Sequence, residues 1–375
     1  MILKFPKNFY WGTATSAYQV EGGIRNDWSQ AGKKYDAGLA CDHYHRFEED
    51  FDLAKRMNNN AHRFSIEWAR IEPEEGKFDQ KEIEHYRKVI FALRQRNLEP
   101  FVTLYHWTLP VWFTKKGGWL NKDAPEYFGK FVEKVVKEYK DLVKFWITLN
   151  EPNIYTSMSF LKGNWPPFIK NWLKTQRVFK QLIRAHIKAY KIIRKISPFS
   201  RIGIATNNIW YRGIIKLFAG YKWNHKFLSA IKDYQNFIGL NYYFSHSLSS
   251  IVLKRGEVND LGWKIVPEGI YHVLKDLKKY NKAIFITENG LADVKDKKRA
   301  RFIIEHLKWV HKAIEEGIDV RGYFYWSLID NFEWDKGFWP RFGLIEINYK
   351  NNLGRIPRPS SKIYARICKN NALDI

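Results

Sequence analysis

Eight short apolar runs, each of strand length, recur along the 375-residue chain and alternate with helical patterns. The runs are rich in β-branched and aromatic residues, as strands are. Near-continuous apolar strands separated by amphipathic helices are typical of a parallel sheet covered on both faces. Eight such strands can close a barrel, so the sequence predicts an α/β protein with a (β/α)8 TIM barrel. The runs are Phe9–Thr15, Ala61–Trp68, Pro100–Trp107, Lys144–Asn150, Arg201–Asn207, Phe237–Tyr243, Ala283–Glu288 and Val320–Leu328.

Helical spacing of apolar residues is clearest in four of the intervening segments: Pro125–Tyr139, Trp172–Ile196, Gly269–Lys279 and Lys298–Glu315. A doubly wound open sheet is the alternative fold, but no Gly-x-Gly-x-x-Gly follows the first run. No linker-like stretch or internal repeat divides the chain, and 45% of its residues are hydrophobic. We therefore expect one domain over residues 1–375.

The formal net charge of +24 is the feature of the composition that says most about binding partners. The electrostatic field of so many positive charges attracts anionic partners. Lys and Arg are spread along the chain, and no nucleic-acid-binding signature is present, so a lysine-rich solvated surface is favoured over nucleic-acid binding. The basic and aromatic stretch 165–195 leaves open a weak association with an anionic membrane surface. An ordinary barrel helix is the favoured interpretation of that stretch.

The two cysteines bear on the cellular compartment. Cys41 and Cys368 form neither a Cys-x-x-Cys motif nor a disulfide framework, which favours a reducing environment. The first twelve residues lack a signal-peptide pattern, and no apolar run reaches the ~18 residues of a membrane span. These features predict a cytoplasmic protein.

Two of the eight runs end in a glutamate, at the edge where a TIM barrel carries its chemistry. Glu151 follows the fourth run in Asn150-Glu151-Pro152, and Glu288 ends the seventh in Thr287-Glu288-Asn289-Gly290. A glutamate at the end of an apolar strand is costly unless it is used or paired, and a single one is often only a salt-bridge partner. Two carboxylates facing one barrel mouth suit cleavage of a glycosidic bond.

Four long motifs resemble those of family 1 glycoside hydrolases, the β-glucosidase and β-galactosidase family. The segment Phe9–Gly22 resembles the N-terminal signature of the family. Thr148–Pro152 resembles its acid/base motif, Ile286–Gly290 its nucleophile motif, and Gly322–Trp334 its sugar-binding segment. The resemblance runs from Phe5 to about Ile367, with the motifs in the family order.

The resemblance implies a retaining exo-β-glycosidase that acts on terminal non-reducing β-D-glucosides by double displacement through a covalent glycosyl-enzyme. Glu288 would be the nucleophile and Glu151 the general acid/base, with carboxyl groups roughly 5–5.5 Å apart. Arg63, in a segment that matches the second-strand motif of the family, would hold Glu288 ionised, and Tyr243 would donate to the same carboxylate. β-D-galactosides, fucosides and alkyl glycosides remain alternative substrates.

Sugar recognition is expected from seven further residues: Gln19, His106, Trp107, Asn150, Trp326, Glu333 and Trp334. Asn150 would contact the 2-hydroxyl, and Trp326 would form a stacking floor. Glu333 would repel a phosphate group, which favours an unphosphorylated sugar. His106 is disfavoured as a metal ligand because no second ligand stands at the required spacing, and neither a cofactor nor a metal is implied.

The chain departs from the family pattern by being a short variant, with brief loops after Gly163 and after Asn207. Thr108 and Asn236 stand where the family often has aspartates. Alternatives from other classes are a catalytically silent sugar-binding relative and a basic nucleic-acid or membrane-binding barrel. The two intact glutamates argue against both. The sugar preference, the natural aglycone, the balance between hydrolysis and transglycosylation, and the oligomeric state are left open by the sequence.

Overall fold

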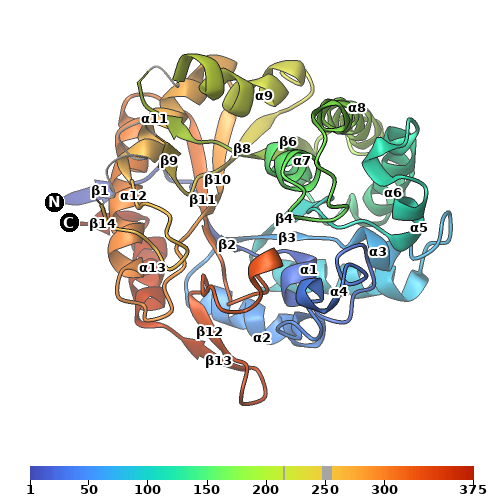
Figure 1. Ribbon diagram of the computed structural model, residues 1–375. Coiled ribbons are helices and arrows are strands. Elements are labelled where there is room, and N and C mark those ends of the chain that lie inside the picture. The colour runs from blue at the N-terminus through green and yellow to red at the C-terminus, as the bar shows by residue number, and fades with distance from the viewer. Residues whose placement is uncertain (214–215, 247–255) are drawn as a thin grey trace.

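The computed structural model describes residues 1–213, 216–246 and 256–375. Its centre is a closed barrel of eight strands in the order β10-β11-β2-β3-β4-β5-β6-β8, seen down its axis in Figure 1. Every neighbouring pair is parallel, so the predicted (β/α)8 TIM barrel is confirmed. The strands are β2 (Tyr10–Ala14), β3 (Ala61–Ser65), β4 (Glu99–Thr103), β5 (Phe145–Asn150), β6 (Arg201–Asn207), β8 (Phe237–Asn241), β10 (Ala283–Asn289) and β11 (Val320–Trp326).

Four of the predicted runs extend two or more residues past the end of the strand that contains them. The second run continues to Trp68, but β3 ends at Ser65, and α3 (Trp68–Ile71) begins where the run was expected to end. The third run continues to Trp107, whereas β4 ends at Thr103. The sixth and eighth runs are each two residues too long. Loop residues at the barrel mouth remain buried, so their apolar character extends the strand pattern beyond the strand itself.

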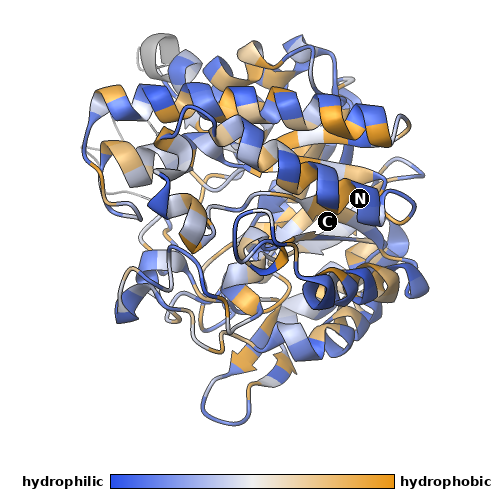
Figure 2. Ribbon diagram, turned by 90° about the vertical axis from the view of Figure 1, so that its right-hand side faces the viewer, coloured by the Kyte–Doolittle hydropathy of each residue, from blue (hydrophilic) through white to orange (hydrophobic). Residues whose placement is uncertain are grey.

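Long helices cover the outside of the barrel. They are α2 (His43–Arg56), α4 (Gln80–Gln95), α6 (Ala124–Tyr139), α8 (Trp172–Ile196), α11 (Glu268–Leu277), α12 (Arg299–Glu315) and α13 (Pro359–Asn370). The four predicted helices are confirmed to within two residues at each end. Each long helix has both hydrophilic and hydrophobic positions (Figure 2), as expected of helices that pack one face on a sheet.

Local sequence explains where these helices begin. Asp79 caps α4 by accepting hydrogen bonds from the backbone of Lys81 and Glu82. Asn171 caps α8 through the backbone N–H of Lys174. Asn and Asp are favoured caps because their side chains satisfy N–H groups that have no partner in the first turn.

Shorter elements complete the chain. Between strands and long helices lie α1 (Ala17–Val20), α5 (Val111–Lys115), α7 (Pro152–Thr156) and α9 (Lys226–Ala230). Three two-stranded sheets pair β1 (Ile2–Lys4) with β14 (Ala372–Asp374), β12 (Ile345–Asn348) with β13 (Gly354–Pro357), and β7 (Trp210–Tyr211) with β9 (Ser245–His246). The β1–β14 pair brings the two termini together.

Within the described ranges, no helix combines the length and the apolar character needed to cross a bilayer. Cys41 and Cys368 are both buried and not disulfide-bonded.

Candidate active site

The two glutamates lie at the barrel mouth, at the carboxyl ends of β5 and β10, two strands that β6 and β8 separate in the barrel. Glu151 directly follows β5 and precedes α7, and Glu288 is the next-to-last residue of β10. Both side chains are buried in the mouth. The backbone of Glu151 is left-handed, with φ of 41°, a conformation that costs energy for a residue other than glycine and that recurs at functional sites.

Glu288 is held by two donors. The Arg63 guanidinium lies 2.5 Å from one carboxylate oxygen, and the Tyr243 hydroxyl donates to the other at 2.6 Å. Arg63 is 1% exposed, and a buried cation requires a charged partner. The two donors therefore fix the orientation of the Glu288 carboxylate.

Glu151 is held by amide groups instead of a cation. Its Oε1 accepts from Asn207 at 3.2 Å and from Asn241 at 2.9 Å. Burial, followed by the charge of Glu288, raises the pKa of Glu151 to about 8. The two carboxyls are thus set up differently, one beside a cation and one held by neutral amides, as expected for a base or nucleophile and an acid.

Asn207 and Asn241 were not predicted as site residues. Each is the last residue of its strand, β6 or β8, so its position at the carboxyl edge of the barrel was the available signal. Asn241 also donates to Asn150 at 3.2 Å, which ties the surroundings of Glu151 to those of Glu288.

His106 and Asn150 form a relay whose hydrogens can be assigned. The Asn150 oxygen accepts from Arg63 at 2.7 Å, so its Nδ2 is the group that meets His106 Nε2 at 3.0 Å. His106 Nε2 must then accept, which leaves the proton on Nδ1. Burial and the charge of Arg63 hold the pKa of His106 well below its usual range, so the ring is neutral. Its Nδ1–H is buried with no partner among the described residues.

A cavity of about 340 Å³ opens above these groups. Every predicted site residue lines this cavity except Arg63 and Asn150, which contact residues of its wall without lining it themselves. Residues on the wall that the sequence analysis did not single out include Ile154, Met158, Lys162, Trp165, Asn207, Phe244, Leu261, Trp263, Asp335, Lys336 and Phe342. Most of these come from loops, where no periodic pattern identifies them.

Indole rings form one side of the cavity. The Trp334 ring lies 4.8 Å from Trp107 and 6.0 Å from Trp165, measured between centroids. Trp107 also donates its Nε1–H to the Asn150 carbonyl at 2.9 Å, so it both lines the cavity and holds the relay. Trp326 lies across the His106 ring at 6.1 Å with nearly parallel planes.

Gln19 and Glu333 meet at one end of the cavity. The Gln19 amide donates to Asn331 Oδ1 at 2.8 Å and to the Phe332 carbonyl at 2.9 Å, which fixes the segment that carries Glu333. Burial, followed by the charge of Glu288, raises the pKa of Glu333 to about 8. Much of this carboxyl is therefore protonated at neutral pH and can donate as well as accept.

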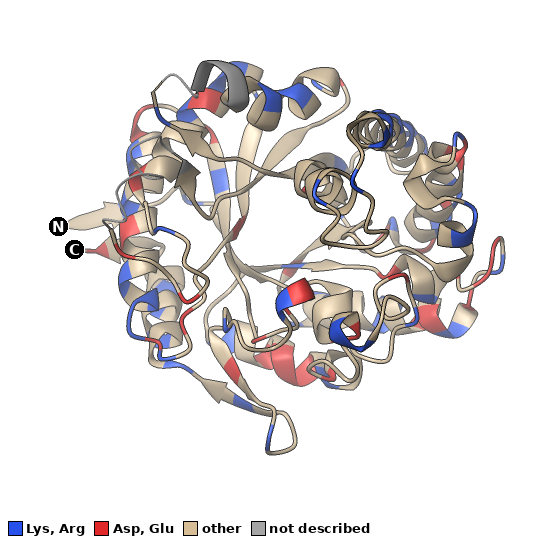
Figure 3. Cartoon of the chain, in the orientation of Figure 1, with Lys and Arg blue, Asp and Glu red and all other residues tan. Residues whose placement is uncertain are grey.

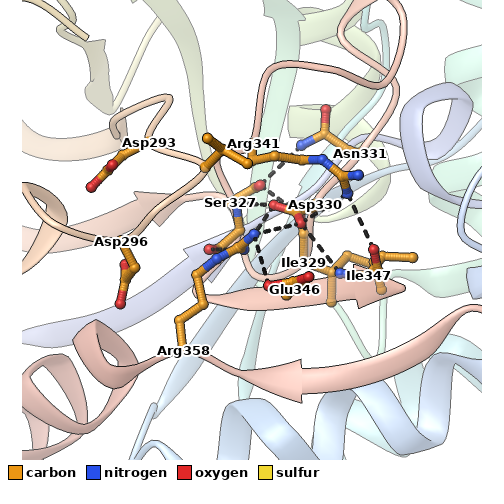
Figure 4. A network of polar contacts seen from close by, with 12 residues as sticks. Asp293, Asp296, Ser327, Ile329, Asp330, Asn331, Arg341, Glu346, Ile347 and Arg358 are labelled. Atoms are coloured by element: carbon orange, nitrogen blue, oxygen red, sulfur yellow. Dashed lines mark hydrogen bonds and ion pairs between the residues drawn. The ribbon is translucent and has the colours of Figure 1, made fainter. Parts of the chain in front are cut away.

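A second buried network supports the same segment from below (Figure 4). Asp330 is fully buried and accepts hydrogen bonds from both terminal nitrogens of Arg358, each at 2.9 Å. It also accepts the Gly343 N–H at 2.9 Å and one nitrogen of Arg341 at 3.2 Å. A bidentate pair with further donors is geometrically specific, so it anchors the chain between Trp326 and Glu333.

Glycine is required where β10 leaves the barrel. A Cβ on Gly290 would lie 1.8 Å from the Trp326 carbonyl oxygen, a distance that no side chain tolerates. The close approach lets the strand end that carries Glu288 pack against the strand end that carries Trp326.

The two departures from the family pattern both have partners. Thr108 donates to Glu67 at 2.8 Å, and the Asn236 oxygen accepts from the Ile202 N–H at 3.0 Å. Both therefore have structural roles, away from the cavity wall. No group of three or more His, Cys, Asp or Glu residues that could hold a metal is found in the described part of the chain.

Comparison with known proteins agrees with this geometry. The sequence matches the family model described as glycosyl hydrolase family 1 over residues 1–214 and 222–373. A 1,4-beta-D-glucan glucohydrolase of Thermotoga neapolitana is 35% identical, and the match covers 99% of each chain. That alignment spans 441 positions against 375 residues here, which agrees with a short variant.

Solved structures show the same likeness. A beta-glycosidase from Pyrococcus horikoshii has a TM-score of 0.93 and 38% identity, covering 100% of this chain and 97% of that one. A beta-glucosidase from Thermotoga maritima, in complex with galacto-hydroximolactam, has a TM-score of 0.92 and 33% identity over 99% and 100% of the two chains. The chain therefore belongs to glycosyl hydrolase family 1 and is a glycoside hydrolase of the β-glucosidase type.

Proposed function

We propose that the protein is a retaining exo-β-glycosidase that releases terminal, unphosphorylated β-D-glucose through a covalent glycosyl-enzyme on Glu288. The single observation that carries the proposal is the unequal setting of the two carboxyls. The Glu288 carboxylate accepts hydrogen bonds from Arg63 and Tyr243, whereas the Glu151 carboxyl accepts from the amides of Asn207 and Asn241 and has a pKa raised to about 8.

In the first step, Glu288 attacks the anomeric carbon while Glu151 gives its proton to the departing oxygen. Forming the ester removes the charge of Glu288, which is one of the causes of the raised pKa of Glu151. Glu151 then ionises more readily and can take a proton from water in the second step. Water replaces Glu288 at the anomeric carbon, which restores the original configuration.

The pH dependence follows from the raised pKa. Glu151 must be protonated in the first step, so kcat/KM should fall as the pH rises through about 8. Glu333 has a pKa of about 8 as well, and both carboxyls lie near Glu288. The fall of kcat/KM at alkaline pH therefore reports the titration of these coupled carboxyls together.

Polar groups around the cavity suit ring hydroxyls. The unpartnered Nδ1–H of His106 is a donor, and Glu333 offers a second group in the same cavity. A neutral Glu333 repels a phosphate group less than a charged one does. At neutral pH, the exclusion of phosphorylated sugars therefore needs a second cause besides the charge of Glu333. Lys336, the nearby cation on the wall, is paired with Asp335 at 2.9 Å, so a phosphate would have to disrupt that pair.

The relatives support glucose as the sugar. The proteins from Thermotoga named above are a glucan glucohydrolase and a beta-glucosidase, and the latter also binds a galacto-configured inhibitor. We therefore propose β-glucosides first, with β-galactosides as the second sugar to test.

Release of p-nitrophenol from a panel of α- and β-glycosides tests the proposal. The expected result is release from the β-glucoside, none from α-anomers, and loss of at least ~10⁴-fold in Glu288→Gln. Proton NMR of the first-formed sugar should show the β-anomer. First formation of the α-anomer would contradict the retaining mechanism. A lack of release from every β-glycoside would contradict the assigned activity.

A further inference from the structure

Lys and Arg are spread along the chain, but the net positive charge is concentrated in one stretch that lacks acidic residues. Between Glu151 and Asp233 the sequence contains no Asp or Glu, while it contains sixteen Lys and Arg. That stretch alone therefore supplies +16 of the formal net charge of +24. It includes the longest helix of the described residues, α8, which spans 25 residues, or about 37 Å.

The charges on α8 form a stripe. The six basic side chains that we call the basic face recur every three or four residues, which places them on one side of the helix. Five are exposed, and Lys188 is half-buried. Lys188 pairs with Glu126 of α6, and within α8 no other ion pair with a carboxylate is present. Figure 3 shows α8 with blue positions and no red ones. The basic face consists of Arg177, Lys180, Arg184, Lys188, Lys191 and Lys195.

Large apolar side chains are exposed where α8 begins. Trp172 is 62% exposed and Leu173 is 71% exposed. Leu173 lies one turn before Arg177, in line with the basic face. Phe168, in the preceding loop, is 42% exposed. We call these three residues the apolar tip. Lys170 and Lys174 flank it, and both are exposed.

Like charges three and four residues apart repel one another and destabilise a helix. Exposed Trp and Leu beside them add no stability to the folded monomer. A row of cations that ends in a cluster of Trp, Leu and Phe is suited to bind the surface of a lipid bilayer. The cations meet anionic headgroups, and the apolar tip enters the boundary between headgroups and acyl chains.

We propose that the basic face and the apolar tip of α8 dock this enzyme on an anionic lipid bilayer. Docking there sets the barrel mouth close to the bilayer, because the loop that carries Phe168 and leads into α8 also carries Lys162 and Trp165, which line the active-site cavity. Nucleic acid offers anionic charge without an apolar phase, so it leaves the apolar tip without a role.

Flotation with vesicles tests the proposal on the full chain. We expect binding to phosphatidylglycerol-containing vesicles at low salt, weaker binding at physiological salt, and none to phosphatidylcholine alone. The triple variant Arg177→Glu, Lys180→Glu, Arg184→Glu should lower the partition coefficient at least about tenfold. The matched control Lys55→Glu, Lys81→Glu, Lys88→Glu changes the same net charge on α2 and α4, at exposed positions, and should stay within about twofold of the parent.

The apolar tip has its own variant, Trp172→Ser with Leu173→Ser, which should weaken vesicle binding several-fold without a change in net charge. Activity on p-nitrophenyl β-glucoside confirms that each variant is folded. No vesicle binding by the parent, equal loss in the control triple variant, or full binding by the tip variant would each overturn the proposal. Displacement of the vesicles by a DNA duplex that binds more tightly would do so as well.

Discussion

The two ends of the barrel interior are both buried but are filled in opposite ways. Toward the amino-terminal ends of the strands, aromatic rings close the interior, and the rings of Phe101 and Phe145 stack at 4.2 Å. Phe285 and Phe324 lie edge-on to Phe101 at 5.2 Å and 4.7 Å. At the carboxyl ends, Arg63 and Glu288 replace rings with buried charge. Dispersion and apolar burial stabilise the first end, whereas the second depends on complete pairing.

This difference teaches where stability and activity are separable. Substitution in the aromatic end should unfold the protein but leave each folded molecule active. Substitution at the charged end should abolish activity, with little loss of stability where no buried charge is left without its partner. Four changes test this separation, in decreasing order of expected effect.

The largest effect is expected at Glu151. Glu151→Ala should lower kcat/KM for alkyl or disaccharide β-glucosides by about 10⁴-fold, because their leaving groups need a proton. A dinitrophenyl β-glucoside needs none in the first step, so its first step should be nearly unaffected. Azide should restore turnover and give the β-glycosyl azide, formed in the space that Glu151 vacates. Equal losses for good and poor leaving groups would argue against an acid role.

The next effect is a loss of stability at the aromatic end. Phe145→Ala removes a buried ring and should lower the free energy of unfolding by about 3–5 kcal/mol. Phe145→Leu, the control, keeps most of the apolar volume and should cost less. Denaturant titration measures the loss, and kcat at a temperature where the variant is folded should remain within about threefold. A selective fall in kcat would show that the two ends are coupled.

Tyr243→Phe should have an intermediate effect on activity. It removes the 2.6 Å hydrogen bond to Glu288 but leaves Arg63 in place. A hydrogen bond to a charged group contributes about 1.5–3 kcal/mol, so we expect a fall in kcat of about ten- to a hundredfold. The free energy of unfolding should fall by no more than the same ~1.5–3 kcal/mol. Arg63→Met serves as the contrasting variant, because it leaves Glu288 buried without a cation.

The last effect, on the pH dependence of stability, concerns Glu67, a buried carboxyl that follows the carboxyl end of β3 and caps α3. Burial raises its pKa to about 7, from 4.5. The folded state then binds the proton more tightly than the unfolded state, so Glu67 lowers stability as the pH rises from about 4.5 to 7. Glu67→Gln should remove up to about 3 kcal/mol of that pH-dependent loss, as measured by unfolding at pH 5 and pH 8. The same pH dependence in parent and variant would contradict the assignment.

Much of the barrel could be predicted because each strand carries its own apolar run and each long helix its own period. The ends of β3 and β4 could not, because buried loop residues such as Leu104 and Tyr105 look like strand. The small sheet β12–β13 also escaped prediction, since its strands are short and outside the barrel. The single domain and the cytoplasmic location stay predictions.

The candidate site was predicted from motifs, together with Arg63 and Tyr243, which hold Glu288, but several other supporting residues were not. Glu151 and Glu288 stand out because a carboxyl ends an apolar run. Asn207 and Asn241 have no such contrast, and their contact with Glu151 follows from strand order. The pair of Arg358 with Asp330 joins residues 28 positions apart through tertiary packing, and no local pattern identifies it. The proton on His106 Nδ1 likewise depends on three side chains from separate strands and loops.

The central claim is that Glu288 forms the covalent intermediate while Glu151 supplies the proton. A 2-deoxy-2-fluoro-β-glucoside with a good leaving group should inactivate the enzyme. The fluorine slows both steps, whereas the good leaving group speeds only the first, so the glycosyl-enzyme accumulates. Peptide mass spectrometry after digestion locates the label. The account predicts one fluoroglucosyl group, attached to Glu288. Label on Glu151 or another residue, or turnover without any labelled protein, would contradict it.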